Sequence, residues 1–132
     1  MKKNPTLLFV VAAALVRDDG KILLQKRPEG RSMAGLWEFP GGKLEDGEQP
    51  EDALARELHE ELAIEVDAAD LVPACFASAA LGDRPLILCL YICRLWVGAP
   101  LPMESPELGW FDVAEMRDLT MPPADLPLLD LL

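Results

Sequence analysis

Residues 50–62 constrain the fold more than any other stretch, because their apolar side chains follow the repeat of an α-helix. Leu54, Leu58 and Leu62 recur at every fourth position and would form one buried stripe along such a helix. Pro50 is tolerated at the first helical position, where its missing N–H has no intrahelical partner in any case. The pattern therefore predicts a helix over residues 50–62 with its leucines facing the core.

A second row of side chains on the same helix is acidic. Glu57, Glu60 and Glu61 stand at positions i, i+3 and i+4, so the helix places them on one face. Like charges at this spacing cost an isolated helix a few tenths of a kcal/mol per pair, and a bound cation would offset that repulsion. A solvated acidic face is the simpler alternative, but it leaves unexplained why Arg56 and the glycines at 41–42 accompany these glutamates. We therefore favour a cation site, with Arg56 placed to orient Glu60.

The composition is that of one globular domain over residues 1–132, with 51% apolar and 27% charged residues. Twelve Lys and Arg against 23 Asp and Glu give a net charge of −11, which argues against binding to a DNA or RNA polymer. An acidic protein still binds a small polyphosphate when a divalent metal neutralises both sides. The three cysteines form no C-x-x-C pair, which favours buried free thiols in a reducing compartment over disulfides or a zinc site.

The N-terminus resembles the start of a signal peptide, because Lys2 and Lys3 precede an apolar run at residues 7–16. That run ends in a turn sequence at residues 17–20, and a second apolar stretch follows at once. A buried strand that enters a hairpin explains this order better. No stretch reaches the ~20 apolar residues that a membrane span needs. We therefore expect a cytoplasmic protein that does not associate with membranes.

The rest of the chain alternates strand and loop patterns around this helix. Residues 7–16 and 21–26 are expected to pair as a hairpin, and residues 36–40 lead into the paired glycines. Those glycines permit either a close backbone approach to a ligand or a plain tight turn. The other elements expected are strands at 74–80, 86–97 and 110–113, a helical turn at 114–117 and a C-terminal helix at 124–132.

Residues 42–64 resemble the signature of the Nudix hydrolases, G-x5-E-x7-R-E-U-x-E-E-x-G-U, in which U is an aliphatic residue. The positions that match in register are Gly42, Glu48, Arg56, Glu57, Leu58, Glu60, Glu61 and Ile64. Ala63 stands where the family has a glycine that ends the helix in a left-handed conformation, and alanine there costs about 1 kcal/mol. Because this position bears no functional group, we expect a local adjustment without loss of catalysis.

The resemblance extends over nearly the whole chain and is closest to the MutT-like branch, which includes 8-oxo-dGTP diphosphatases and CTP pyrophosphohydrolases. The further segments that carry it are residues 35–43, 109–111 and 122–125. It implies an α/β fold, namely an α/β/α sandwich with a mixed central sheet. It also implies hydrolysis of a nucleoside triphosphate to the monophosphate and pyrophosphate with Mg²⁺ or Mn²⁺, in nucleotide-pool sanitation. The expected protein is a monomer or a homodimer, and the sequence does not select between the two.

The same resemblance assigns roles to the acidic residues. The metal ligands that it implies are Glu57, Glu60, Glu61 and, through its carbonyl, Gly41, and hard cations take such oxygen ligands. Glu104 matches a further family glutamate that contacts metal or water, although Glu107 lies close by in the same loop. Glu57 is also a candidate to accept a proton from water. The expected catalytic set is Arg56, Glu57, Glu60, Glu61 and Glu104.

Substrate contacts follow from the resemblance as well. Arg27 corresponds to a family arginine near the phosphates, and Lys43 is either a second phosphate-binding cation or a surface charge. Asp83 and Arg84 match a turn that lies over the nucleotide in related enzymes. Phe39 offers an apolar contact to the base.

Asp125 bears on which base is bound. Oxidised-guanine enzymes of this branch often carry Asn at this position, whereas a cytidine-nucleotide relative carries Asp. An ionised Asp only accepts hydrogen bonds, which suits the exocyclic amine of cytosine, whereas a protonated Asp also donates to a purine carbonyl. A helix N-cap for the C-terminal segment is compatible with either. The preferred substrates are thus oxidised dGTP or a cytidine nucleotide, with the choice between them open.

Two other functions compete with this one. The first is hydrolysis of another nucleoside-diphosphate-linked substrate, such as a dinucleotide or a nucleotide sugar, and the compact length and residues 122–125 argue against it. The second is a non-catalytic nucleotide- or protein-binding module. Such a module would be expected to lose metal-site glutamates, and this chain retains them all.

Overall fold

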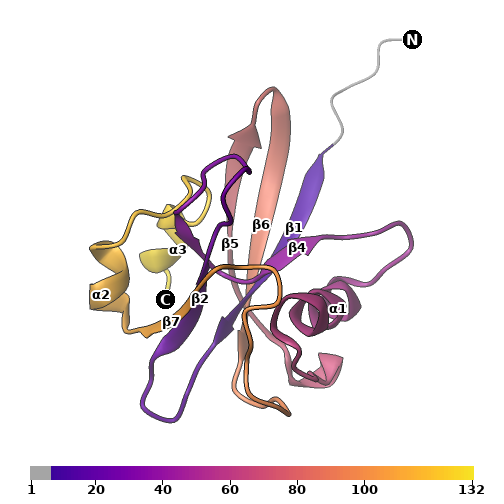
Figure 1. The fold of residues 1–132 in the computed structure, drawn as a ribbon. Coiled ribbons are helices and arrows are strands. Elements are labelled where there is room, and N and C mark those ends of the chain that lie inside the picture. The colour runs from indigo at the N-terminus through magenta and orange to yellow at the C-terminus, as the bar shows by residue number, and fades with distance from the viewer. Residues whose placement is uncertain (1–6) are drawn as a thin grey trace.

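The computed structural model describes residues 7–132 as two β-sheets with helices on either side (Figure 1). Lys2 and Lys3, on which the resemblance to a signal peptide rests, lie outside the described residues. Within the described part of the chain, no helix is both long enough and apolar enough to cross a membrane.

The larger sheet is mixed, as predicted. Its strands lie in the order β4-β1-β6-β5. The central strands β1 (Leu8–Leu15) and β6 (Arg84–Cys93) run parallel, and β4 (Gly41–Lys43) and β5 (Val72–Leu81) add antiparallel edges. The glycines at 41–42 are therefore part of a strand, so the tight turn that they might have formed is absent there.

The smaller sheet corrects the predicted hairpin. The turn at residues 17–20 forms, but only one bridge, between Val16 and Ile22, joins the two arms. Strand β2 (Ile22–Lys26) then pairs antiparallel with β3 (Trp37–Glu38) and β7 (Leu108–Phe111). The hairpin prediction was wrong because sequence proximity indicates a turn, whereas the ladder partner depends on distant strands.

The helix over residues 50–62 is confirmed as α1 (Pro50–Leu62), with its leucines buried. A short 3₁₀ helix (Ala68–Asp70) follows, and α2 (Val113–Arg117) and α3 (Leu126–Leu129) lie near the C-terminus. The C-terminal helix is shorter than predicted. Pro127 is tolerated only in a first helical turn, so the helix cannot begin much before it.

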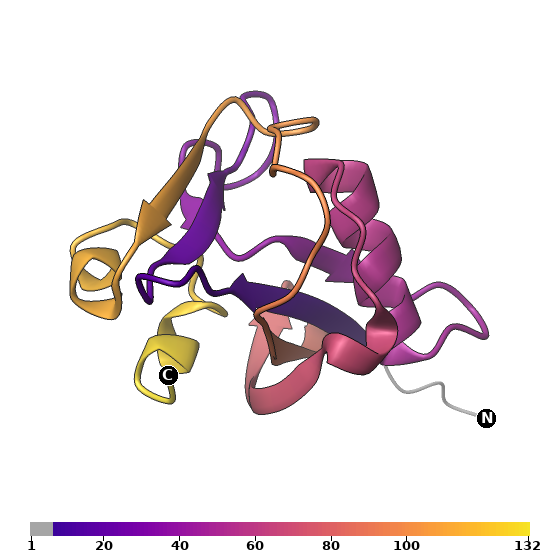
Figure 2. The same ribbon diagram turned by 90° about the horizontal axis from the view of Figure 1, so that it is seen from below.

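Strand β6 also ends earlier than predicted, at Cys93 rather than at residue 97. Val97 exchanges both of its backbone hydrogen bonds with Glu65 instead, with N–O distances of 2.9 and 3.0 Å. This bridge draws the chain that follows β6 toward the segment that follows α1. A long loop, residues 94–107, then arches past the end of α1 to the smaller sheet (Figure 2).

The core divides into two clusters on the two faces of β1. Val11, Ala13 and Leu15 pack against α1, whereas Ala12 and Ala14 face the other cluster, which includes side chains of α2 and α3. The nearly continuous apolar run of β1 is therefore explained by burial on both faces, as predicted. This arrangement, with α1 on one side of the mixed sheet and α2 and α3 on the other, is an α/β/α sandwich (Figure 2).

Candidate functional site

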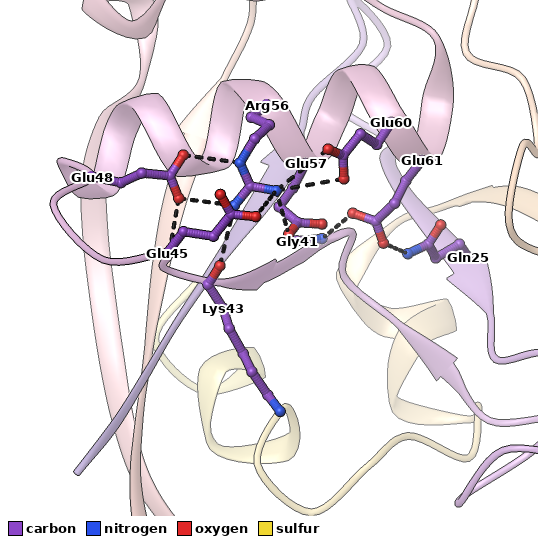
Figure 3. A network of polar contacts seen from close by, with 9 residues as sticks. All are labelled: Gln25, Gly41, Lys43, Glu45, Glu48, Arg56, Glu57, Glu60 and Glu61. Carbon is purple, nitrogen blue, oxygen red and sulfur yellow. Dashed lines mark hydrogen bonds and ion pairs between the residues drawn. The ribbon is translucent and has the colours of Figure 1, made fainter. Parts of the chain in front are cut away.

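Arg56 organises the acidic face of α1 (Figure 3). Its Nε and Nη2 atoms donate to the two carboxylate oxygens of Glu48, each at 2.9 Å, and its Nη1 donates to Glu57 at 3.0 Å. The expected contact with Glu60 exists but is longer, at 3.5 Å. The pKa of Glu48 is lowered to about 2. The bidentate bond from Arg56 is the larger cause, and the hydrogen bond that Glu48 accepts from the N–H of Glu45 is the second. Arg56 thus ties the loop before α1 to the helix.

The glycines of β4 allow α1 to lie close to the sheet. A Cβ atom on Gly41 would collide with the backbone carbonyl of Val11, and one on Gly42 would lie 2.5 Å from Cδ of Glu57. The Glu57 carboxylate therefore occupies the space that a side chain at residue 42 would fill. Burial raises the pKa of Glu57, and Arg56 opposes that shift. Both glycines therefore permit close contacts within the protein, Gly41 with β1 and Gly42 with Glu57, whereas their predicted approach to a ligand stays a prediction.

Glu61 is the most deeply buried of the three helix glutamates, with 7% of its surface exposed. Its Oε1 accepts a hydrogen bond from Nε2 of Gln25 at 2.7 Å, and its Oε2 accepts one from the N–H of Gly41 at 3.1 Å (Figure 3). Burial raises its pKa to about 8, the Gln25 bond works against this shift, and the charges of Glu57 and Glu104 add to it. A carboxylate kept in this position is well suited to pair with a cation.

The loop that carries Glu104 is anchored to the end of α1. The N–H groups of Leu101 and Met103 donate to the carbonyls of Leu62 and Glu61, at 2.9 and 3.1 Å. These carbonyls belong to the last turn of the helix, where no intrahelical donor remains for them. Capping the helix end therefore brings Glu104 to the side of Glu61, although the two residues are far apart in sequence.

A small polar cavity of about 40 Å³ lies at this junction. Its lining consists of Gln25, Lys26, Arg27, Pro28, Arg31, Glu38, Glu61, Glu104 and Ser105. Glu104 is part of the lining and Glu107 is not, which favours the former of the two loop glutamates. The backbone carbonyl of Glu107 instead accepts a bond from the N–H of Lys26, at 3.0 Å.

A larger surface hollow of about 490 Å³ lies elsewhere, beside the β1–β2 turn. Arg17, Asp19, Arg94 and Trp96 contribute to its lining, and none of the predicted site residues does. We place the candidate site at the smaller cavity because three of the predicted site residues, Arg27, Glu61 and Glu104, line it. Size alone does not identify a site whose chemistry depends on charge.

The donor set fits a hard divalent cation, although the carboxylates are not yet gathered around one point. Among residues 7–132, no group of three or more Asp, Glu, His or Cys side chains lies close enough together to hold a metal ion. Glu57 is turned toward Arg56, and Glu60 is largely exposed. All the candidate donors are nonetheless oxygens, and the burial of Glu61 among other acids calls for positive charge.

Arg27 lines the same cavity, but its side chain is already engaged. Its Nη1 donates to Glu38 at 2.9 Å and its Nε donates to the carbonyl of Ser32 at 2.9 Å. Burial raises the pKa of Glu38, and Arg27 opposes that shift. A phosphate that approached Arg27 would thus compete with the Glu38 carboxylate.

Three other predicted substrate contacts lie apart from the carboxylates. The side chain of Lys43 points away from them, and only its backbone carbonyl meets Arg56, at 3.4 Å (Figure 3). Asp83 and Arg84 sit at the tip of the β5–β6 hairpin (Figure 1). Within the described chain, no hydrogen bond joins either of them to the helix glutamates.

Asp125 and Phe39 form a second buried site. Asp125 is 7% exposed, and its Oδ2 accepts a hydrogen bond from the N–H of Phe39 at 3.3 Å. Asp125 does occupy the N-cap position of α3, as the alternative predicted, but its side chain makes no capping bond to the helix. Burial raises the pKa of Asp125 to about 7. The Phe39 ring is itself buried in the core, 4% exposed.

Gln25 is the site residue that the sequence did not reveal. It lies on β2, and its amide meets Glu61 across 36 positions of sequence. The available signal was one polar side chain inside the apolar strand sequence ILLQK. A lone glutamine of this kind gives no indication of its partner until the tertiary fold brings the helix to it.

Comparisons with known proteins show which family this chain resembles. The family model described as NUDIX domain matches residues 7–132. A CTP pyrophosphohydrolase of Escherichia coli (strain K12) is 38% identical over 123 residues, which cover 93% of this chain and 90% of that protein. An 8-oxo-dGTP diphosphatase of Haemophilus influenzae is 35% identical, over 92% of this chain and 89% of its own length.

Solved structures of similar proteins share the fold of this chain. The solution structure of the E. coli ORF135 protein is similar to this chain with a TM-score of 0.86 and 37% identity, covering 96% of this chain and 89% of that one. The crystal structure of a MutT NUDIX hydrolase from Burkholderia pseudomallei follows with a TM-score of 0.82 and 29% identity, covering 96% of this chain and 98% of that one.

Proposed function

Because this chain belongs to the NUDIX family of hydrolases, we propose that it hydrolyses a nucleoside triphosphate to the monophosphate and pyrophosphate with Mg²⁺ or Mn²⁺. The observation that carries the proposal is the buried Glu61 carboxylate, held by Gln25 and Gly41 beside Glu57 and Glu104. Two relatives named for a triphosphate substrate, CTP and 8-oxo-dGTP, support it. The biological role that follows is nucleotide-pool sanitation.

The residues that would hold the metal are Glu57, Glu60 and Glu61, with the carbonyl of Gly41 and with Glu104 from the loop. A divalent cation bound there supplies charge neutralisation for the phosphoryl oxygens of the substrate. Glu57 and Glu61 keep their places through protein contacts alone, since Arg56 holds the first and Gln25 holds the second. Arg56 is therefore a positioning residue in this scheme.

Proton transfer from the attacking water needs a carboxylate that is ionised and within hydrogen-bond reach of that water. Glu57 is our candidate for this proton acceptor. Its carboxylate packs directly on the backbone of Gly42, which has no side chain, and Arg56 orients it. Arg27 is the candidate for phosphate binding, and it would exchange its contact with Glu38 for one with the substrate. Lys43, Asp83 and Arg84 remain proposed contacts of secondary weight.

Asp125 is our candidate for reading the base. It is buried beside the backbone of Phe39, and its pKa of about 7 allows both the ionised and the protonated forms near neutral pH. An ionised carboxylate accepts from the amine of cytosine, whereas the protonated form donates to a purine carbonyl. A cytidine nucleotide should therefore be favoured above neutral pH and oxidised dGTP below it.

The decisive experiment incubates the protein with Mg²⁺ and a panel of normal and oxidised nucleoside triphosphates, and identifies the products. Dinucleotides and nucleotide sugars belong in the same panel, because they test the rival hydrolase function. Pyrophosphate and monophosphate from at least one triphosphate are expected. Release of neither from any triphosphate would refute the proposal, and turnover of the diphosphate-linked compounds alone would favour the rival.

A Glu57→Gln variant tests the role of that carboxylate. Loss of the acceptor should lower kcat by about two to four orders of magnitude. The matched control is Glu65→Gln, since Glu65 is an exposed glutamate paired with His59 and remote from the cavity lining. Equal rates for the two variants would contradict the role given to Glu57.

A further inference from the structure

The buried amide of Gln25 is only half satisfied. Gln25 is 5% exposed, and its Nε2 donates to Glu61 at 2.7 Å. Its Oε1 atom has no hydrogen-bond partner, and it is the one buried side-chain nitrogen or oxygen of which this is true among the described residues. Buried acceptors in folded proteins nearly always have a donor, so this atom calls for one that arrives with a ligand.

None of the donors around the cavity, which also include Arg31, makes a hydrogen bond to this oxygen. The Arg27 guanidinium is bonded to Glu38 and to the carbonyl of Ser32. The Ser105 hydroxyl donates toward the carbonyl of Lys26 at 2.6 Å, and the Lys26 ammonium lies over the ring of Trp37 at 5.5 Å. A flip of the Gln25 amide is no remedy in the metal-binding form, because an ionised Glu61 only accepts hydrogen bonds and would lose the Gln25 donor.

The size of the cavity restricts what the ligand-borne donor is. A space of about 40 Å³ exceeds the 10–15 Å³ or so that one water needs and is far too small for a nucleotide. The phosphates of an ionised triphosphate present only acceptor oxygens, so they cannot satisfy a carbonyl oxygen. Water donates, and Gln25 and Glu104 both belong to the lining of this cavity, so a water held between their side chains would have two acceptors.

We propose that Gln25 is a positioning residue with two functions: its NH₂ group holds Glu61, and its carbonyl oxygen accepts a hydrogen bond from a water of a hydrated divalent cation bound at Glu61. This inference rests on the proposed function for its setting. The Gln25 and Gly41 donors each occupy one oxygen of Glu61, so the second lone pairs of that carboxylate stay available to the cation. Gln25 thereby links the smaller sheet to the acidic face of α1.

The first test uses the unaltered protein and no substrate. Mn²⁺ is titrated into isotope-labelled protein while the side-chain amide signals of Gln25 and Gln49 are followed by NMR. Gln49 is the matched reference, because it is the only other glutamine in the sequence, is exposed, and lies at the opposite end of α1. Paramagnetic broadening falls steeply with distance, so the Gln25 signal should disappear first. Simultaneous or reversed loss of the two signals would overturn the proposal.

The second test is a Gln25→Met variant, which keeps the side-chain length and removes both hydrogen-bonding groups. Its affinity for Mn²⁺, measured by electron paramagnetic resonance, should fall about tenfold or more, as for other residues that orient metal ligands. Its kcat should fall by a similar factor, with KM for the nucleotide within about twofold. Gln49→Met, the same change at an exposed site, should leave both values as in the wild type.

The two tests separate this inference from the proposed function. If Gln25→Met binds Mn²⁺ and turns over as the wild type does, the Gln25 assignment fails and the hydrolase function stands. If the wild type cleaves no nucleotide but the Mn²⁺ results are as expected, the function fails and the assignment stands. A crystal structure with Mn²⁺ tests the water itself: Oε1 within about 2.5 Å of the ion would mean direct coordination and would overturn the water-mediated contact.

Discussion

Replacing Asp125 with asparagine should make the protein relatively more stable at high pH. Burial raises the pKa of this carboxyl from 3.8 to about 7, so the folded state holds the proton more tightly than the unfolded state does. Unfolding therefore releases a proton between these two pKa values. The contribution of Asp125 to stability is fully present below about pH 4 and is lost as the pH rises toward 7.

The linkage relation gives the size of this effect. With a pKa of about 7 in the folded state and 3.8 in the unfolded state, the wild type loses about 3 kcal/mol between about pH 5 and pH 8 because of this one group. The asparagine variant carries no charge there in either state, so the same loss is absent from it. Its amide still accepts from the Phe39 N–H, and any cost of burying its NH₂ group does not depend on pH.

The measurement is urea unfolding of both proteins at about pH 5 and pH 8. The other titrating groups are common to both proteins, so they largely cancel when the wild-type free energy of unfolding is subtracted from that of the variant. That difference should rise by about 3 kcal/mol in favour of the variant as the pH is raised. A difference that is the same at both pH values would refute the argument that Asp125 is buried as an acid.

Three further predictions concern the helix and its glycines. Gly42→Ala places a Cβ atom 2.5 Å from Cδ of Glu57, so the rate of pyrophosphate release should fall at least about tenfold. The circular dichroism spectrum should stay unchanged. A normal rate would mean that Glu57 need not occupy that space. Ala63→Gly removes the strain of an alanine in the left-handed conformation, with φ of 57°. The free energy of unfolding should rise by about 1 kcal/mol with no change in activity. A destabilised variant would contradict the strain assigned there. Arg56→Lys removes the bidentate bond to Glu48 and should reduce kcat about tenfold. The control is Arg117→Lys, at an exposed ion pair, which should leave kcat unchanged. Comparable kcat values for the two variants would argue against the positioning role of Arg56.

The parts of the fold that follow from local sequence were predicted well. The helix over residues 50–62 has the predicted bounds, because leucine spacing and Pro50 act within the helix itself. The left-handed end of the helix at Ala63 is also as expected, with φ of 57° and its N–H bonded to the carbonyl of His59. These features depend on residues within a few positions of one another.

Strand partners and strand ends were harder to predict. The apolar pattern of residues 21–26 is the same whether the strand pairs with β1 or with β7, so it does not select between them. Likewise, the apolar run beyond Cys93 gave no sign that Val97 would bond to Glu65. Both outcomes depend on contacts between segments that are distant in the chain.

The sequence alone determined that Glu57, Glu60 and Glu61 would share one face of a helix, because spacing along a helix sets which side chains lie on the same side. Only the tertiary structure decided which of these carboxylates is buried, since burial of Glu61 depends on a strand, a loop and a glutamine drawn from elsewhere in the chain. It also decided that the Asp125 side chain accepts a hydrogen bond from the N–H of Phe39, 86 positions away, rather than making a capping bond to α3. Burial and hydrogen bonding set the pKa of a carboxyl group, and both are properties of the assembled fold.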